Sequence, residues 1–299
     1  MMKRQLTRLN SCSGPIAGKW LGMFPQSWWL EFEDSSFIMA LRFRCGIPVV
    51  PVGKKCMHCK VKDQDIKCEA ELDVWGDHCV LCGIGGHKFT RHSALNHVLA
   101  EAGRAAGYST LLEQVVPEFA SIKTSEDGSI AIVEARIDVE LYGHAYAPDH
   151  LLDGTIRHPV TKSHLVEASR EGGHSAEKGV KDKLKRYPPK HGKALIGCAM
   201  ETWGRFSKSL DALLEELAGL AGRRQRDRGV QPTKWLLKWR TQISLCVAVH
   251  IGRCILDALP NDVRNYRHQH LSVPFSEADS WDSGNPYPGS GRLNTLAPD

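Results

Sequence analysis

The sequence predicts a mixed α and β fold, of the α+β or α/β class, in which a small metal-binding segment precedes a sheet flanked by helices. Three observations predict it. Cysteine and histidine residues gather between residues 51 and 92, apolar and polar residues alternate in short segments between 111 and 156, and apolar residues recur at helical spacing elsewhere. With 299 residues, of which 42% are hydrophobic, the chain can form one large core or two small ones.

Composition and charge narrow the class of protein. Lys and Arg number 39 against 34 Asp and Glu, a net charge of +5, which allows a nucleic-acid partner but excludes a polybasic, histone-like protein. The N-terminus lacks the apolar run of a signal peptide, and His250 and Arg253 interrupt the most apolar stretch, residues 243–259. We therefore expect an intracellular protein, nuclear or cytoplasmic and not secreted, with no membrane partner.

Residues 1–50 form an aromatic-rich helical lead-in, with loosely helical spacing around Phe37 to Arg44 and no pattern that suggests chemistry. Pro48, Pro51 and Gly53 then break the pattern, so residues 47–55 are predicted to be a linker. The lead-in is therefore separated from the cysteine- and histidine-rich segment 51–92.

The segment 51–92 has the spacing of a zinc knuckle. Cys56 and Cys59 form one close pair, and beyond residues 60–77 a second pair ends at Cys82. Zinc takes four Cys or His ligands in a tetrahedron, and two close pairs joined by a loop satisfy this geometry with little strain. Spacing alone allows either His78 or Cys79 to partner Cys82. The remaining candidates are expected to be spare polar residues, and they are His58, Cys68, His87 and His92.

Residues 93–222 are expected to form the main core. Helical spacing of apolar residues predicts a helix over 91–106 that ends at Gly107. Alternation predicts strands over 111–116 and 129–141, with a turn at 125–128 between them, and a third strand over 151–156. A basic helix at 174–186, a buried strand at 194–200 and an amphipathic helix at 209–220 follow.

The C-terminal part is predicted to contain one more helix. Residues 223–262 begin with a basic linker containing four arginines, and a helix is predicted over 233–259. Residues 263–299 are rich in Pro, Gly, Ser and Asn, so we expect a disordered tail.

Asp138 and Asp153 are expected to lie opposite each other. If the strands at 129–141 and 151–156 form a hairpin with its loop centred at 145–146, residues whose numbers sum to 291 face each other. Two opposed carboxylates repel unless a cation lies between them, and Mg²⁺ is typically held by one or two carboxylates. Spacing alone also fits ordinary polar residues at strand ends.

The segment 178–193 carries cations almost without anions. Such a segment suits contacts with a phosphate backbone, and a lysine from it can offset charge beside a metal. The same pattern also fits a solvated helix face. The basic residues are Lys178, Lys181, Lys183, Lys185, Arg186, Lys190 and Lys193, against Asp182 alone.

An ordered series of short motifs runs from about residue 20 to about residue 260. They are Trp20-Leu21, Ala40 to Pro48, Cys56-x2-Cys59, Gly76-Asp77-His78-x3-Cys82, Arg91-His92, Arg136-x-Asp138, Asp153 to Pro159, Lys183-x2-Arg186-Tyr187 and Glu201-Thr202-Trp203-Gly204. In order and spacing, the set resembles the C-terminal region of non-LTR retrotransposon polyproteins, where a zinc knuckle precedes a restriction-like endonuclease.

The resemblance implies a PD-(D/E)xK-type nuclease core over residues 93–222 that nicks target DNA. It implies that Asp138 and Asp153 hold Mg²⁺ or Mn²⁺ and that Lys183 steadies the scissile phosphate. DNA is the implied partner, and element RNA is a further one. The implied ligands of a structural zinc are Cys56, Cys59, His78 and Cys82. The side chains expected to contact nucleic acid are Arg91, His92, Lys178, Lys181, Lys185 and Arg186.

The sequence departs from the family pattern in three places. No proline precedes the Asp138 motif, and Ser93 stands where the family has asparagine. No lysine lies two residues after Asp153, so Lys162 and Lys178 are alternatives to Lys183. The sequence also contains no reverse transcriptase motif, so we expect the tail of a larger element. The alternative function is a zinc-dependent nucleic-acid-binding module, a transposon remnant with an inactive nuclease core.

Overall fold

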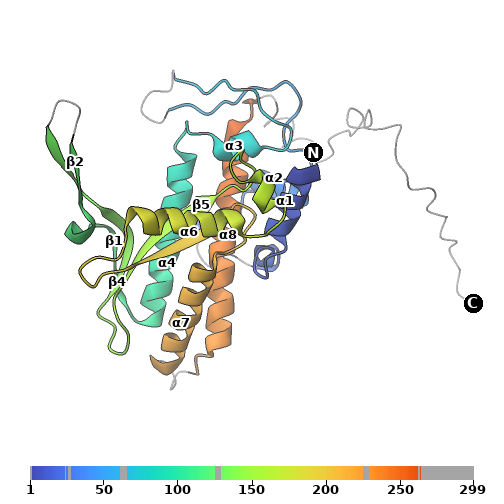
Figure 1. The fold of residues 1–299 in the computed structure, drawn as a ribbon. Helices are drawn as coiled ribbons and strands as arrows, with labels where there is room; N and C mark the ends of the chain where they lie inside the picture. Colours follow the sequence, from blue (N-terminus) through green and yellow to red (C-terminus); the bar gives the residue numbers. More distant parts are fainter. Residues whose placement is uncertain are drawn as a thin grey trace, which may run out of the picture.

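A mixed four-stranded sheet lies at the centre of the fold (Figure 1). The computed structural model describes residues 2–23, 25, 28–60, 66–124, 129–224, 229–261 and 263. The strand order is β1 (Ser109–Val115), β4 (Arg136–Tyr142), β5 (His150–Arg157) and β6 (Leu195–Glu201). Strand β4 runs antiparallel to both β1 and β5, whereas β6 runs parallel to β5. The expected mixed α and β class is therefore confirmed.

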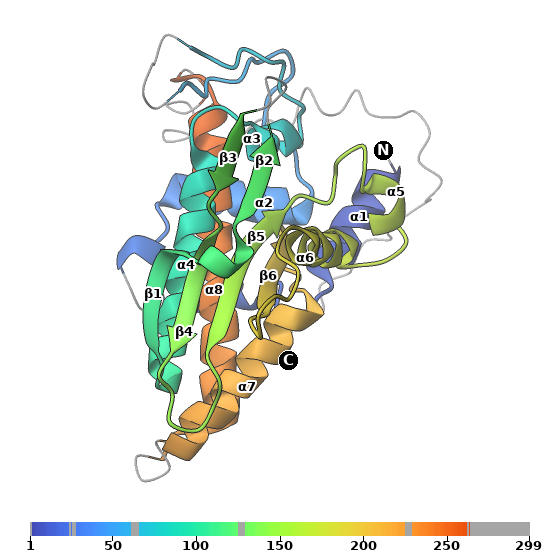
Figure 2. The same cartoon turned by 60° about the vertical axis from the view of Figure 1, so that its left-hand side comes forward.

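Helices cover both faces of this sheet (Figure 2). Helix α6 (His174–Arg186) lies on one face, against β5 and β6, and α4 (His87–Ala106) and α7 (Lys208–Arg224) pack on the other. Gly179 lets α6 approach β5 closely, because a Cβ at this position would lie only 3.0 Å from the Thr155 side chain. Helix α4 instead buries the apolar side chains of Leu95, Val98 and Leu99.

The long helix α8 (Pro232–Ala258) packs against α2 (Asp34–Cys45), α4 and α7. Gly252 allows the approach to α2, since a Cβ there would collide with the Ser36 carbonyl. One apolar cluster runs from Trp20 in the lead-in through the cysteine-rich segment to α8. Within the described residues, no helix is both long and apolar enough to cross a membrane.

Smaller elements complete the described chain. Helix α1 (Met2–Cys12) packs against α5 (Leu165–Ala168), and α3 (Asp77–Leu81) lies beside α8. Three 3₁₀ helices are η1 (Lys19–Gly22), η2 (Trp28–Leu30) and η3 (Pro117–Phe119). Strands β2 (Ser121–Thr124) and β3 (Ile130–Val133) form a separate hairpin that projects from the sheet (Figure 1).

The helices expected over 91–106, 174–186, 209–220 and 233–259 are present, although α4 begins earlier, at His87. The prediction of a single strand over 129–141 is wrong. The chain forms β3 in the projecting hairpin and then enters the sheet as β4, because β3 pairs only with β2 and β4 with β1 and β5. The expected turn at 125–128, part of the basic linker at 225–228 and the tail beyond 263 lie outside the described residues.

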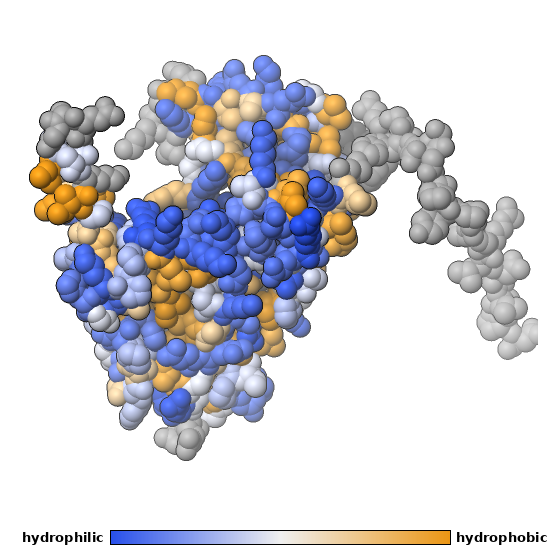
Figure 3. All heavy atoms as spheres, in the orientation of Figure 1, coloured by the Kyte–Doolittle hydropathy of each residue, from blue (hydrophilic) through white to orange (hydrophobic). Residues whose placement is uncertain are grey.

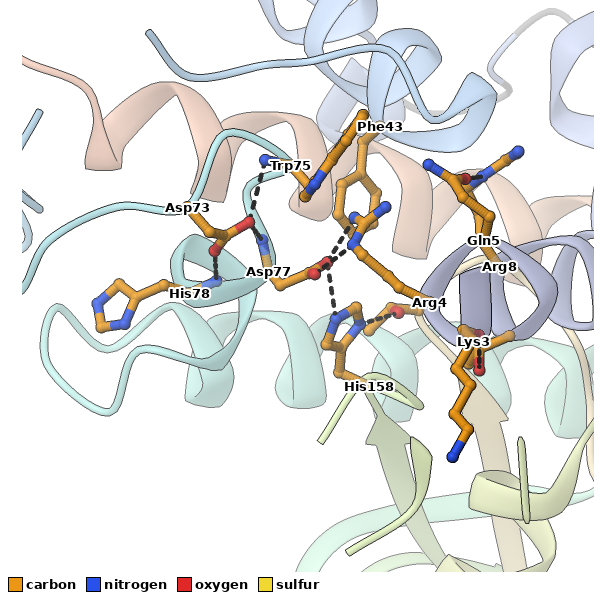
Figure 4. Close-up of polar contacts among 12 residues, drawn as sticks. Lys3, Arg4, Gln5, Arg8, Phe43, Asp73, Trp75, Asp77, His78 and His158 are labelled. Carbon is orange, nitrogen blue, oxygen red and sulfur yellow. Dashed lines mark hydrogen bonds and ion pairs between the residues drawn. The ribbon is translucent and has the colours of Figure 1, made fainter. Parts of the chain in front are cut away.

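A largely buried carboxylate, that of Asp77, joins three distant parts of the chain (Figure 4). Arg4 of α1 donates two hydrogen bonds to it, at 2.5 and 2.7 Å, and His158 after β5 lies 3.2 Å away. His158 also bonds Thr202 at 2.8 Å and packs against Trp203. Burial acts to raise the pKa of Asp77, but the bonds from His158 and Arg4 outweigh it and lower the pKa.

We expect Asp77→Ala to lower the free energy of unfolding by about 3–5 kcal/mol, because it leaves a buried arginine and a buried histidine without their acceptor. Chemical denaturation at pH 7 measures the change. Glu134→Ala, which removes an exposed carboxylate, serves as the control and should change stability by less than about 0.5 kcal/mol. Equal effects of the two variants would contradict the assignment of Asp77 as a joint.

Candidate active site and metal centre

Three cysteines and one histidine form a group that can hold a metal ion such as zinc. The Sγ atoms of Cys56 and Cys82 lie 4.0 Å apart, and Cys68 Sγ lies 3.4 Å from His78 Nε2. Tetrahedral zinc with ordinary bond lengths separates two sulfur ligands by roughly 3.8 Å and a sulfur from a nitrogen by roughly 3.5 Å. The two distances fit a Cys₃His zinc site without rearrangement.

Local structure holds these ligands in place. Asp73 accepts backbone hydrogen bonds from Trp75, Asp77 and His78, at 3.0, 3.0 and 2.7 Å (Figure 4). This carboxylate caps the first turn of α3, the short helix that begins beside His78. Cys82 follows directly at the C-terminal end of α3, where its N–H donates to the His78 carbonyl. The spacing His78-x3-Cys82 therefore places both side chains on one turn.

The structure brings Cys68, and not the expected Cys59, into the group. Cys68 N–H donates to the carbonyl of His58, so these two residues lie opposite each other on an extended ribbon. On such a ribbon, residues opposite each other project from the same face, and so do residues two apart along one strand. Cys56, two residues before His58, therefore lies on the face of Cys68, whereas Cys59 lies on the opposite face. The alternative ligand Cys79 is fully buried outside the group, whereas His78 belongs to it.

Asp138 and Asp153 meet in the register that the sequence predicts. Val139 pairs with Leu152 and Glu140 with Leu151, so the paired residues sum to 291, as expected. Both aspartates are buried, with 7% and 2% of their surface exposed. Gly154 N–H donates to Asp138 Oδ2 at 2.7 Å. The hairpin therefore places two carboxylates side by side in the protein interior.

The two carboxylates do not ionise alike. Burial and the adjacent Asp138 raise the pKa of Asp153 to about 7. Burial also acts to raise the pKa of Asp138, but hydrogen bonds from His92 and Asp153 outweigh it and lower the pKa. The hydrogen bond with Asp138 in turn raises the pKa of His92. One proton is thus retained between the carboxylates near neutral pH.

Helix α4 contributes His92 to this site. His92 Nε2 lies 2.9 Å from Asp138 Oδ2 and 3.1 Å from the Gly154 carbonyl. Asn96, one turn later, lies 3.4 Å from His92 Nδ1. A Cβ on residue 154 would collide with Asn96, so Gly154 is what lets α4 reach the strand. The ligand atoms of His92, Asp138 and Asp153 lie within 4.8 Å of one another, close enough to share one metal ion.

Helix α6 contributes Lys183, whose Nζ donates to Asp153 Oδ1. Only 19% of the lysine side chain is exposed, and the carboxyl belongs to the buried middle part of β5. Of the two alternative lysines, Lys178 pairs with Asp182 at 3.3 Å, and Lys162 is exposed in the loop after β5. The structure therefore brings Lys183 to the carboxylates. Neither alternative has a described contact with Asp153.

Of the other residues expected to contact nucleic acid, those on α6 are exposed and Arg91 is buried. The outward face of α6 exposes basic side chains in a band of hydrophilic surface (Figure 3). Arg91 differs, because only 4% of it is exposed and its Nε and Nη1 atoms have no hydrogen-bond partner among the described residues. It lines a pocket of about 520 Å³ beside His92. The exposed residues on α6 are Lys178, Lys181, Lys185 and Arg186.

The sequence reasoning missed three roles. Cys68, expected to be a spare polar residue, lies in the cysteine cluster. His92, expected to contact nucleic acid and not to be a metal ligand, lies in the carboxylate site. For Cys68 the available signal was a third cysteine between the two pairs. For His92 it was its position one helical turn before Asn96 at the start of a predicted helix. Asp77, recognised only as part of a motif, proves to be a buried joint.

Comparison with known proteins identifies no relative whose function bears on these sites. A scan against protein-family models matches no family, and a search of the curated proteins finds no match. Both the cysteine cluster and the carboxylate site stand on the contacts described above.

We expect Cys68→Ser to lower the zinc content by one ion per chain and Cys59→Ser to leave it unchanged, because only Cys68 lies in the Cys₃His group. Elemental analysis of the purified protein measures the zinc. If the zinc content falls in Cys59→Ser and not in Cys68→Ser, the ligand set expected from spacing is correct and the Cys₃His group is not.

We expect Mn²⁺ binding to tighten about tenfold per pH unit between pH 5 and pH 7 and to level off above, because the cation must displace the proton that Asp153 keeps up to about pH 7. Electron paramagnetic resonance of free Mn²⁺ measures the affinity. Asp153→Asn carries no such proton and should bind Mn²⁺ more weakly, with a shallower profile that reflects His92 alone. A flat profile in the unmodified protein would exclude a proton shared by the carboxylates.

Proposed function

We propose that this protein is a metal-dependent DNA endonuclease of the restriction-like type, equivalent to the C-terminal region of a non-LTR retrotransposon polyprotein. One observation carries the proposal. Two buried carboxylates on adjacent strands, Asp138 and Asp153, meet a lysine from the crossover helix, Lys183, at one point. Paired carboxylates with a lysine are the residue set of PD-(D/E)xK nucleases, and the sequence resembles that family.

Asp138 and Asp153 would hold a divalent cation such as Mg²⁺, whose preferred ligands are carboxylate oxygens. The bound cation would supply Lewis-acid stabilisation of the charge that develops on the phosphodiester oxygens. His92 fixes the orientation of Asp138 through its 2.9 Å hydrogen bond. Lys183 holds its ammonium group beside Asp153, where it can orient the scissile phosphate.

The distant motifs of the resemblance gather at two places, which supports the proposal. The Gly76-Asp77-His78 motif contacts His158 of the Asp153 to Pro159 motif, and this histidine contacts Thr202 of the Glu201 to Gly204 motif. Phe43, from the Ala40 to Pro48 motif, stacks on Trp203 at 5.1 Å. These residues form a structural joint, while the carboxylates and Lys183 lie at the second place.

The DNA would lie across α6 and the adjoining pocket. The exposed lysines of α6 present one sign of charge, as backbone binding requires. The pocket beside His92 is lined by further cations, including Lys88, Arg91 and Arg157. The two surfaces lie on either side of the carboxylate site, since Lys183 belongs to α6 and His92 lines the pocket.

We expect the purified protein with Mg²⁺ or Mn²⁺ to nick supercoiled plasmid, and Asp153→Asn and Lys183→Met each to slow nicking about a hundredfold or more. Lys162→Met is the matched control and should retain the rate, because Lys162 is not brought to the site. EDTA should abolish nicking. If the unmodified protein is inert but still shifts DNA on a gel, it acts as a nucleic-acid-binding module with an inactive core.

We expect the double variant Lys181→Gln and Lys185→Gln to lower the slope of log affinity against log salt concentration for duplex DNA by about 1–2, since each phosphate contact contributes about 0.9. Fluorescence anisotropy of labelled duplex over a range of salt measures the slope. The double variant Lys234→Gln and Lys238→Gln removes an equal charge from the exposed surface of α8 and should leave the slope unchanged. A slope that does not depend on the α6 lysines would place the DNA on another face.

A further inference from the structure

A second group of metal-binding side chains lies apart from the cysteine cluster. It consists of His58, His87 and Cys254, whose ligand atoms lie within 4.8 Å of one another. Each comes from a different segment, namely the ribbon near residue 58, the N-terminal end of α4 and the C-terminal part of α8. These ends of α4 and α8 both reach the loops drawn at the top of Figure 1.

The three side chains are held close and largely shielded from water. His58 is 3% exposed and Cys254 is 1% exposed, while the His87 side chain is 23% exposed. The imidazole rings of His58 and His87 lie with their centroids 4.4 Å apart. His58 Nε2 also lies 3.1 Å from the Cys254 carbonyl oxygen. Such a crowding of nitrogen and sulfur donors in the interior is typical of a structural zinc site.

A carboxylate stands next to the group. Asp257 lies three residues after Cys254, so both project from the same side of α8. Its Oδ2 atom lies 3.9 Å from His87 Nε2. The position suits either a fourth zinc ligand or an acceptor that fixes the orientation of His87, both of which are common around protein zinc.

The charge of a neighbouring arginine favours the same assignment. Burial raises the pKa of the Cys254 thiol to about 12, and the positive charge of Arg91, buried one turn after His87 on α4, acts in the opposite direction. The Arg91 Nε and Nη1 atoms have no hydrogen-bond partner among the described residues. The Cys254 thiol donates to the Cys79 carbonyl at 3.1 Å. A bound zinc ion would take Cys254 as thiolate, with this proton released to solvent, and the thiolate would supply a negative charge near the guanidinium.

We infer that His58, His87 and Cys254 bind a second zinc ion, with Asp257 beside the fourth position. The ion fastens the ribbon and the start of α4 to the end of α8. The two zinc sites are neighbours, because Cys56 and His58 lie two residues apart on one face of the ribbon. The inference rests on no nuclease activity, so it stands or falls separately from the proposed function.

Native mass spectrometry of the zinc-saturated full chain tests it. We expect one zinc ion fewer in His87→Ala than in the unmodified protein and no loss in His97→Ala, the matched control from the exposed side of α4. Because His87 is partly exposed, its variant should fold, and circular dichroism checks this. Cys68→Ser should lose the other zinc independently.

Cobalt provides a second readout. Titration of the metal-free chain with Co²⁺ should give the visible bands of tetrahedral cobalt in two steps, and His87→Ala should remove one step. Zinc or cobalt content that His87→Ala leaves unchanged, at either one or two ions per chain, would overturn the inference.

Discussion

Mutual repulsion between Asp138 and Asp153 is the constraint on which the rest of the site depends. The β4–β5 register forces the two carboxylates together in the interior, where two negative charges cannot both persist uncompensated. Polar side chains from the helices on both faces of the sheet offset this repulsion. Helix α4 brings His92 to one carboxylate and α6 brings Lys183 to the other. A divalent cation completes the compensation in our proposal, which is why the site suits phosphodiester hydrolysis.

The N-terminal third of the chain matters because it contacts the residues that follow β5 and β6. Asp77 ties α1 and α3 to His158, which follows β5, and Thr202 and Trp203, which follow β6, pack on that histidine. The cysteine cluster holds α3 against its ribbon. Helix α3, which carries His78, is therefore joined through Asp77 and His158 to the end of β5, the strand that carries Asp153.

Sequence reasoning reached the carboxylate pair because hairpin register follows from loop length and a period of two. It also reached α4, α6, α7 and α8, but it missed α1, α3 and α5, which are short or carry few apolar residues. It failed at Cys59, because the choice of ligand depends on which face of the ribbon a side chain takes, and close spacing does not encode that. It predicted β3 and β4 as one strand, because apolar and polar residues alternate through both, although β3 pairs with β2 and β4 with β1 and β5. Lys183 came from the family resemblance, since no local pattern distinguishes it from its neighbouring lysines.

The central claim is that Asp138 and Asp153 together hold a catalytic metal ion. Anomalous diffraction from crystals soaked in Mn²⁺ tests it most directly, with Asp153→Asn crystals as the comparison. Our account predicts a manganese peak between the two carboxylates, within bonding distance of both, and no peak there in the variant. A peak elsewhere, or an undisturbed Lys183–Asp153 ion pair with no manganese beside it, would contradict the account.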